Sequence, residues 1–441
     1  MGKRARRSEL VVCMNGETVG YWKITASGKH LFSYAAEWLT SPLRRPISLS
    51  LPLQPESIDH TGSVVENFFE NLLPDNAIIR RRIQHIFGTQ SIHAFDLLSE
   101  IGRDCIGAIQ LLPPGFTETD VKQVKGITVS EKDIEQILLA VPSQNRLLQQ
   151  PMHDFRISLA GAQEKTAFLQ HGKKWKKPVG TTPSTHIFKL PLGDIGPYDL
   201  STSIFNEWLC LNVLKEFGIP AAEAHIEQFG SQTVIIVKRF DRQWANDKKW
   251  IMRLPQEDMC QAAGISPGLK YESDGGPGIQ KIMKLLLGSN AFLHDRRVFF
   301  TSQLLFWLLA APDGHAKNFS IFLLPKGEFR LTPLYDVLSA YPVMGTGKKQ
   351  IPPQKMKMAM AVFGKNRHYH WDKILPRHWF ETGTAAGVSG TIVSEIIQEI
   401  KEKTRTVIDA VRNRLPDYFP GHVADSIFKG MKMAVKKLGM K

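Results

Sequence analysis

The sequence contains little cysteine, and its four cysteines follow no recognised spacing. Cys13, Cys105, Cys210 and Cys260 lie far apart, with no CxxC pair and no histidine at a zinc-finger distance. Disulfide-rich secreted domains and structural zinc sites both require regularly spaced ligands. The pattern therefore argues against a disulfide framework and against a zinc site, and we expect four ordinary buried thiols.

Long uncharged apolar runs are also absent. The longest, residues 298–312, contains Thr301, Ser302 and Gln303 and falls short of the ~20 residues that a membrane helix requires, so it predicts a buried helix. The basic start MGKRARR is not followed by an apolar segment of the signal-peptide kind. We therefore expect a cytoplasmic protein that has no contact with a membrane.

Acidic residues are outnumbered by basic ones, most of all near the end of the chain. There are 56 Lys and Arg against 42 Asp and Glu, a formal net charge of +14, and residues 341–441 alone hold 18 basic and 8 acidic side chains. Residues 348–377 carry eight of these basic residues against a single acid, Asp372. This density suits a polyanion such as a DNA or RNA backbone. A solvated basic face explains the charge equally well.

The length of 441 residues predicts more than one lobe, because a single hydrophobic core rarely grows so large. Asn15-Gly16 between two β-rich runs predicts a hairpin near the start. Short strand candidates and one helical run follow between residues 154 and 241, and the rest is mainly helical. We therefore predict an α+β, kinase-like two-lobed fold. Its expected parts are an N-terminal β-containing subdomain (1–150), a nucleotide-binding N-lobe (151–242) and a mainly helical C-lobe (243–441).

The segment PDGHAKN and the later TPLYD form a pattern typical of phosphoryl transfer. Asp313 is followed by Asn318 and, eighteen residues later, by Asp336. This chemistry needs one carboxylate to take the proton of the attacking hydroxyl, and an amide oxygen and a second carboxylate to hold Mg²⁺. His315 and Lys317 lie between these residues and could stabilise charge on the phosphate. Alone, the pattern is also explained by a capped turn and a solvated aspartate.

A second group of residues lies upstream at a distance that suits a kinase. Lys189 in a strand candidate precedes Glu207 in the next helix by eighteen residues, and such a pair holds the α- and β-phosphates of a nucleotide. Either residue alone is better explained by a surface salt bridge. The small-residue turn 160–165 (AGAQEK) could bring backbone N–H groups close to phosphates, although it lacks the GxGxxG pattern.

Several phrases together resemble the HipA family of toxin kinases. They include DFRISLAGAQEKTAFL, THIFKLPLG, KRFDR, RLPQEDMCQ, YESDGGPG, DGHAKN and LTPLYD, with RPISLSLPL, FFENLLPD and DLLSEIGRDCIGA nearer the start. The resemblance covers the chain from about Met14 to beyond His378, and the last ~60 residues match less distinctively. It implies a serine/threonine-protein kinase that uses ATP and Mg²⁺.

The resemblance also assigns roles to single residues. It implies Asp313 as the catalytic base, Asn318 and Asp336 as Mg²⁺ ligands, and Ser158 as the serine that such kinases autophosphorylate. A phosphate on Ser158 would place negative charge where the ATP phosphates bind and so prevent binding. The implied nucleotide contacts are Ala160, Gly161, Ala162, Gln163, Glu164, Lys165, Lys189, Lys238, Arg239, Phe240, His315, Asn318 and Tyr335.

Two positions differ from the family pattern. Lys238 stands where the hinge sequence ERF has glutamate, and Pro312 replaces the usual threonine before Asp313. Both leave the set of catalytic groups complete.

The resemblance further implies partners. These are a HipB-like helix-turn-helix antitoxin, operator DNA reached through that complex, and glutamyl-tRNA synthetase as the protein substrate whose phosphorylation halts growth. Lys373 and Arg377 match the stretch of the family that contacts DNA, which would make the complex nucleoid-associated. Two alternatives stay open: a kinase-shaped co-repressor with little transferase activity, and a kinase that acts on a small molecule.

Overall fold

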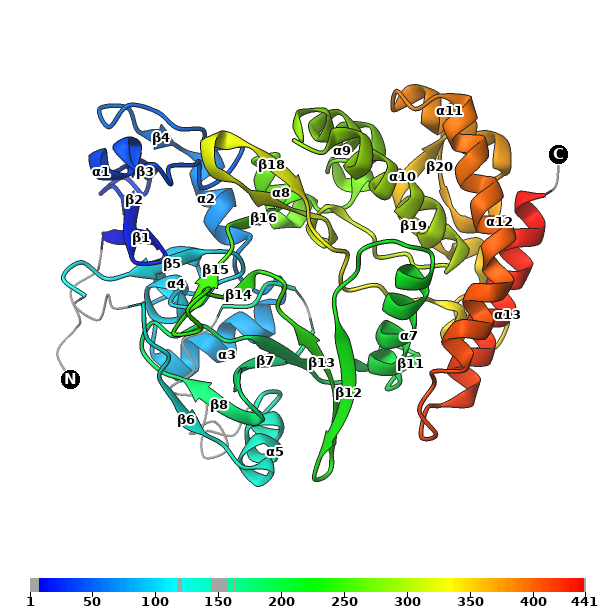
Figure 1. The fold of residues 1–441 in the computed structure, drawn as a ribbon, viewed down its shortest axis with the longest axis horizontal. Helices are drawn as coiled ribbons and strands as arrows, with labels where there is room; N and C mark the ends of the chain where they lie inside the picture. The colour runs from blue at the N-terminus through cyan, green and yellow to red at the C-terminus, as the bar shows by residue number, and fades with distance from the viewer. Residues whose placement is uncertain (1–7, 117–120, 144–157, 162, 440–441) are drawn as a thin grey trace.

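A computed structural model describes residues 8–116, 121–143, 158–161 and 163–439 of the chain (Figure 1). The first part is a five-stranded antiparallel sheet in the order β4-β3-β2-β1-β5, next to four short helices. Its core includes Trp22, whose ring stacks on that of Phe69 with the centroids 3.8 Å apart. Its elements are β1 (Glu9–Met14), β2 (Glu17–Ile24), β3 (His30–Tyr34), α1 (Ala36–Thr40), β4 (His60–Thr61), α2 (Ser63–Glu70), α3 (Ala77–Phe87), α4 (Ala94–Ile101) and β5 (Ile109–Leu112).

The predicted hairpin at Asn15-Gly16 is present between β1 and β2. Both residues have positive φ, 49° and 89°, which is the conformation that Asn-Gly favours in a two-residue turn. Helix α2 ends at Glu70, before Pro74, and α3 begins at Ala77 after its N-cap Asn76, whose side chain accepts a hydrogen bond from the Ile78 N–H.

The second sheet has six antiparallel strands in the order β12-β13-β9-β7-β8-β6. Successive residues of β13 are apolar and buried on opposite faces: Val234 and Ile236 pack with α5, whereas Ile235 and Val237 pack with α7. The sheet is therefore buried on both sides. Its elements are β6 (Gly126–Thr128), α5 (Glu131–Ala140), β7 (Lys165–His171), β8 (Lys174–Pro178), β9 (His186–Lys189), α7 (Ser203–Glu216), β12 (Ala224–Phe229) and β13 (Gln232–Lys238), with the hairpin β10 (Gly193–Ile195) and β11 (Tyr198–Leu200) beside it.

The boundary expected near residue 150 falls after β6 and α5. Both elements belong with the second sheet, because β6 pairs with β8 and α5 packs on β12 and β13. The first sheet ends at β5, so the change from one sheet to the other occurs between Leu112 and Gly126.

The last part of the chain is mainly helical, and its helices α11, α12 and α13 lie on the side of the molecule opposite the first sheet (Figure 1). Its helices are α8 (Met259–Ala262), α9 (Ile279–Leu285), α10 (Phe292–Leu308), α11 (Pro376–Ala385), α12 (Gly390–Arg412) and α13 (Gly421–Leu438). Its strands are β14 (Arg242–Trp244), β15 (Ile251–Arg253), β16 (Gln256–Asp258), β17 (Ser320–Leu323), β18 (Phe329–Leu331), β19 (Lys357–Phe363) and β20 (Arg367–His370).

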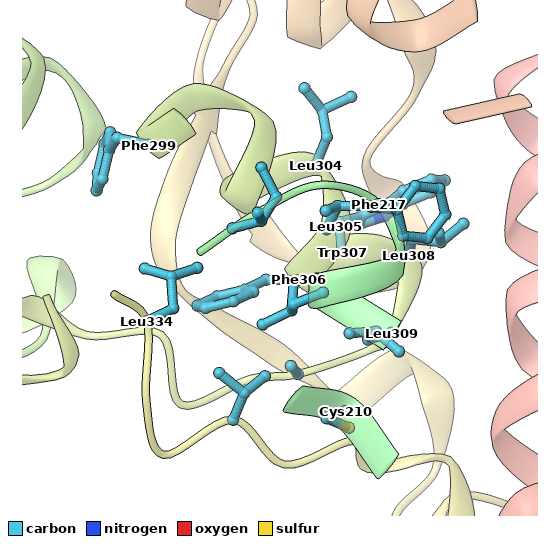
Figure 2. Close-up of a cluster of buried hydrophobic side chains, with 14 of the residues drawn as sticks. Cys210, Phe217, Phe299, Leu304, Leu305, Phe306, Trp307, Leu308, Leu309 and Leu334 are labelled. Carbon is cyan, nitrogen blue, oxygen red and sulfur yellow. The ribbon is translucent and has the colours of Figure 1, made fainter. Parts of the chain in front are cut away.

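Helix α10 forms the centre of this helical part and confirms the buried helix expected over residues 298–312. Its C-terminal half, Leu304 to Leu308, is buried all round (Figure 2). Side chains from α7 and from the segment around Leu334 pack on it, so the segment that follows α10 starts from a rigid support. Within the described residues, no helix is long and apolar enough to cross a membrane. All four cysteines are free and buried, as expected.

Candidate active site

The predicted pair of Lys189 and Glu207 is formed. Lys189 is the last residue of β9, and Glu207 lies on α7, which packs on the sheet. The lysine Nζ donates to Glu207 Oε1 at 2.7 Å and to Asp336 Oδ1 at 3.0 Å. Three residues expected at separate places in the sequence thus meet at one point between the two lobes.

The charges at this point stabilise one another. Burial alone would lower the pKa of Lys189, but Asp336 and Glu207 together raise it above its usual range, so the lysine stays charged. Burial would raise the pKa of Asp336, yet Lys189 and Lys165 lower it to about 2. Asp336 has a positive φ of 59°, a strained backbone conformation of the kind found at functional sites.

The segment after α10 holds the predicted base. The Asn318 side-chain Nδ2 donates to the Asp313 backbone oxygen at 2.7 Å, and this bond closes the loop that contains both residues. The Asp313 side chain is half exposed, whereas His315 is buried, with its Nε2 3.7 Å from Asp313 Oδ1. Tyr271, which the sequence did not single out, donates a hydrogen bond to the same Oδ1.

The small-residue loop lies against the N-terminal sheet domain. Gly161 has a φ of 105° and pairs with Pro74, and its carbonyl accepts the Asp75 N–H at 3.2 Å. The positive φ of Gly161 is one that L side chains rarely adopt, so glycine is favoured there. Lys165 Nζ donates to the Ala160 carbonyl, and burial, followed by the charge of Lys189, lowers its pKa to about 8.

The other positions of this loop contact parts of the chain that frame it. Gln163 Nε2 donates to the Leu190 carbonyl at 2.5 Å, and Glu164 forms an ion pair with Arg82 of α3 at 2.8 Å. Ala162 lies outside the described residues.

The hinge after β13 lines the pocket with Lys238, Arg239 and Phe240. The Lys238 Nζ lies 2.9 Å from Glu223 Oε2. The lysine that stands in place of the family's glutamate thus forms an exposed ion pair. The Phe240 ring lies 5.8 Å from that of Tyr335, whose hydroxyl donates to the Lys317 carbonyl.

Below the hinge, a buried charge cluster ties the N-terminal domain to it. Asp104 lies within 3.2 Å of the guanidinium groups of Arg239 and Arg242, and Asp241 pairs with both. All four side chains are nearly inaccessible. Burial alone would raise the pKa of Asp104, but the guanidinium groups of Arg239, Arg242 and Arg253 hold it far below its usual range.

A single cleft gathers most of the predicted residues. Those that line it are Ala160, Gly161, Gln163, Lys165, Lys189, Lys238, Arg239, Phe240, Asp313, His315, Lys317, Asn318, Tyr335 and Asp336. Glu164 and Glu207 do not line the cleft, and each acts through an ion pair with a neighbour. The arrangement places a charged lysine, two carboxylates, an amide and an aromatic side wall around one space, as a phosphorylated nucleotide and an attacking hydroxyl require.

Comparison with known proteins agrees with this geometry. Residues 157–408 match the model of the HipA-like C-terminal domain, and residues 10–112 match that of the HipA N-terminal domain. The chain belongs to the HipA family. The N-terminal match ends at the last residue of β5, where the first sheet ends.

Other members of the HipA family match along most of the chain. The putative kinase Y4mE of Sinorhizobium fredii is 29% identical over 95% of this chain and 96% of its own. The serine/threonine-protein kinase toxin HipA of Shewanella oneidensis is 28% identical over 69% of each. A chain in the structure of the Shewanella HipA, HipB and operator DNA complex superposes with a TM-score of 0.79 at 21% identity, covering 98% of both chains. The predicted two-lobed, kinase-like α+β fold is thereby confirmed.

Lys317 has partners that the sequence did not predict. Its Nζ donates to the backbone and side-chain oxygens of Asn71 at 3.0 and 2.9 Å, and lies 3.5 Å from both Asp75 and Asp258. Asp75 also pairs with Lys270 at 3.0 Å. The phrase FFENLLPD carries Asn71 and Asp75, but nothing in its pattern tells that they reach the cleft from another domain.

The residues expected to hold Mg²⁺ suit that ion. Asp336 supplies a carboxylate, and the hydrogen bond from Asn318 Nδ2 to Asp313 directs the Asn318 amide oxygen away from that carbonyl. Mg²⁺ is commonly held by one or two protein oxygens together with phosphates and water. The described part of the chain has no group of three or more His, Cys, Asp or Glu that could hold a metal.

Ser158 differs sharply in exposure from Lys373 and Arg377. Ser158 is fully buried and donates to the Leu72 carbonyl at 2.8 Å, so its hydroxyl cannot reach Asp313 in this conformation. Residues 348–377 form the β19–β20 hairpin and its flanks, and the side chain of Lys373 is 70% exposed. Arg377, on the first turn of α11, is also exposed.

Proposed function

We propose that this chain is a serine/threonine-protein kinase toxin of a type II toxin-antitoxin system, which transfers the γ-phosphate of ATP to a protein serine. The observation that carries the proposal is the contact of Lys189 with both Glu207 and Asp336, in a cleft that also holds Asp313. An ordered lysine and glutamate pair together with two separate carboxylates is what phosphoryl transfer requires. Relatives named as kinases support the same activity.

Each residue then has a distinct task. Lys189 binds the α- and β-phosphates and is kept in place by Glu207. Asp336 and Asn318 would hold Mg²⁺, which neutralises charge on the phosphates when it is bound. The ring of Phe240 and that of Tyr335 border the adenine, and backbone groups of residues 238–240 contact its edge.

Asp313 acts on the acceptor. The hydroxyl oxygen of the acceptor forms a bond to the γ-phosphorus while its proton passes to the Asp313 carboxylate. The bond between the γ-phosphorus and the oxygen that bridges it to the β-phosphate breaks, and its electron pair leaves with ADP. His315 is buried beside Asp313 and helps to orient it. Lys317, bound by Asn71, supports the loop from below and adds positive charge to the cleft.

The cellular role follows from the same proposal. We infer that the substrate is glutamyl-tRNA synthetase, whose phosphorylation would stop charging of the tRNA and halt growth, giving persistence. A HipB-like antitoxin would neutralise the kinase and bring it to operator DNA, where Lys373 and Arg377 contact phosphates. The Shewanella complex of HipA, HipB and operator DNA supports this assembly. The protein would thus be cytoplasmic, and nucleoid-associated within the complex.

Autophosphorylation of Ser158 would inactivate the kinase. Since Ser158 is buried against Leu72, the segment must first leave this position. A phosphate of about −1.5 to −2 charge would be too large and too strongly hydrated for the fully buried position of the Ser158 hydroxyl, so the loop over the ATP phosphates would be lost.

The test is transfer of labelled phosphate from Mg²⁺·ATP, with and without glutamyl-tRNA synthetase, followed by mapping of the modified residues. We expect phosphate on Ser158 and on the synthetase with the wild type and none with Asp313→Asn. Asp425→Asn, a change at an exposed carboxylate of α13, is the matched control and should retain full activity. ATP binding without transfer by the wild type would contradict the proposal and favour a co-repressor.

A further inference from the structure

Residues 269–278 form a segment, here called the strap, that reaches the cleft at Lys270 and contacts Asp313 through Tyr271. Three contacts fix it to different parts of the molecule. Lys270 pairs with Asp75 of the N-terminal domain at 3.0 Å, and its carbonyl accepts the Ala316 N–H of the catalytic segment at 3.1 Å. Glu272, which is buried, accepts the Ala361 N–H of β19 at 2.7 Å.

The strap is tightly turned, which keeps its first half in one position. The Gly276 N–H donates to the Tyr271 carbonyl at 3.0 Å, and a side chain at Gly276 would lie 2.1 Å from the Leu269 carbonyl. Glycine is therefore required at this turn. Tyr271 is thus presented from a rigid element rather than from a free loop.

The Tyr271 side chain is directed at the base. Its hydroxyl donates to Asp313 Oδ1, and its ring packs edge-on against His315 with the centroids 5.0 Å apart. Among the described residues, the Asp313 carboxylate has these two contacts on the same oxygen: Oδ1 accepts the hydrogen bond from Tyr271 and lies 3.7 Å from His315 Nε2. The Asp313 side chain is half exposed, so the second oxygen, Oδ2, is the one left for a substrate.

We propose that Tyr271 is a positioning residue that holds Asp313 by Oδ1, so that Oδ2 receives the proton of the acceptor hydroxyl. The inference rests on the proposed kinase function and deepens it by dividing the two carboxylate oxygens between positioning and chemistry. A carboxylate held at one oxygen has one rotamer and one orientation toward an in-line acceptor. Burial and then the neighbouring charge of Asp313 raise the pKa of Tyr271, so the phenol remains a hydrogen-bond donor throughout the neutral range.

A different role for the same contact makes the opposite prediction. If the Tyr271 hydroxyl simply occupied the place of the acceptor, it would block the site, and its removal would speed transfer. The positioning role predicts slower transfer, because Asp313 then samples orientations from which it cannot take the proton.

The experiment compares Tyr271→Phe with the wild type in steady-state transfer to the protein substrate. The variant keeps the ring against His315 and removes only the hydroxyl. We expect kcat to fall roughly tenfold or more, while KM for ATP, the directly measured ATP affinity and the thermal midpoint stay near wild-type values. Tyr418→Phe is the control, because its exposed hydroxyl lies far from the cleft near Ile226, and it should change none of these quantities.

Each other result overturns the inference. An unchanged or increased kcat in Tyr271→Phe, with an active wild type, refutes the positioning role alone. Loss of kcat in Tyr271→Ala but not in Tyr271→Phe assigns the effect to ring packing and also refutes it. A wild type that binds ATP but transfers no phosphate refutes the proposed function and this inference together, so the two failures can be told apart.

Discussion

Glu257 on β16 offers a sharp test of the electrostatics inside the protein. Its carboxyl is fully buried where the N-terminal domain meets the helical lobe, and Oε1 accepts the Leu49 N–H at 2.8 Å. Burial raises the pKa of Glu257 from 4.5 to about 8. The folded protein therefore holds a proton at neutral pH that the unfolded chain has released.

This proton makes stability depend on pH. Between the two pKa values the folded state binds more protons than the unfolded state, so the free energy of unfolding falls as the pH rises. The contribution is fully present below the unfolded value of 4.5 and is lost progressively as the pH passes through about 8. Relative to acid pH, linkage lowers the free energy of unfolding by about 2 kcal/mol at about pH 6 and by about 5 kcal/mol at about pH 9. The difference is about 3 kcal/mol.

Glu257→Gln removes the titration and keeps the shape and the acceptor for Leu49. The free energy of unfolding of each protein is measured by denaturant titration at several pH values. We expect the difference, variant minus wild type, to grow by about 3 kcal/mol between about pH 6 and about pH 9. Other titrating groups cancel in this difference. Glu381→Gln, at an exposed position of α11, should give a flat difference. A flat difference for Glu257→Gln, or one that grows toward acid pH, would refute the reasoning.

Three further expectations concern other charges. Asp104→Asn removes one of the two carboxylates that pair with the buried guanidinium groups of Arg239 and Arg242, and should lower the free energy of unfolding by about 3 kcal/mol or more in denaturant titrations. Glu207→Gln frees Lys189 from its support, and should lower kcat/KM for ATP at least about tenfold. Replacing Lys373 and Arg377 together by alanine should lower the salt dependence of operator binding by the antitoxin complex by about 1.8 in log-log slope.

The residues that meet in the cleft could be found from the sequence because the proposed chemistry imposes their spacing. The distances from Asp313 to Asn318 and from Lys189 to Glu207 are set by one loop and by one strand-helix unit, so local sequence is enough to find them. The hairpin at Asn15-Gly16 was found for the same reason, since two residues determine the turn. In each of these cases, the residues of one short segment determine the local structure.

The remaining features depend on partners that are distant in the sequence. Asn71 binds Lys317 across 246 positions, and Tyr271 contacts Asp313 across 42. No periodicity or local propensity signals such a contact. The placement of β6 and α5 with the second sheet was missed for a similar reason, because it depends on strand pairing with β8 rather than on composition. The pairing of Glu207 with Lys189 was predicted from their spacing, whereas the burial of Glu207 is known only from the structure.

These distant contacts show why the N-terminal domain belongs to the active site. Asn71 accepts hydrogen bonds from Lys317, Asp75 pairs with Lys270, and Asp104 pairs with the guanidinium groups below the hinge. Each of these acids or amides comes from the first domain, and each cation belongs to the kinase lobes. Buried cations without such partners would carry a large desolvation cost. The cleft therefore has its present form because two domains share its charges, and a change in their contact would alter the hinge, the catalytic segment and the strap at the same time.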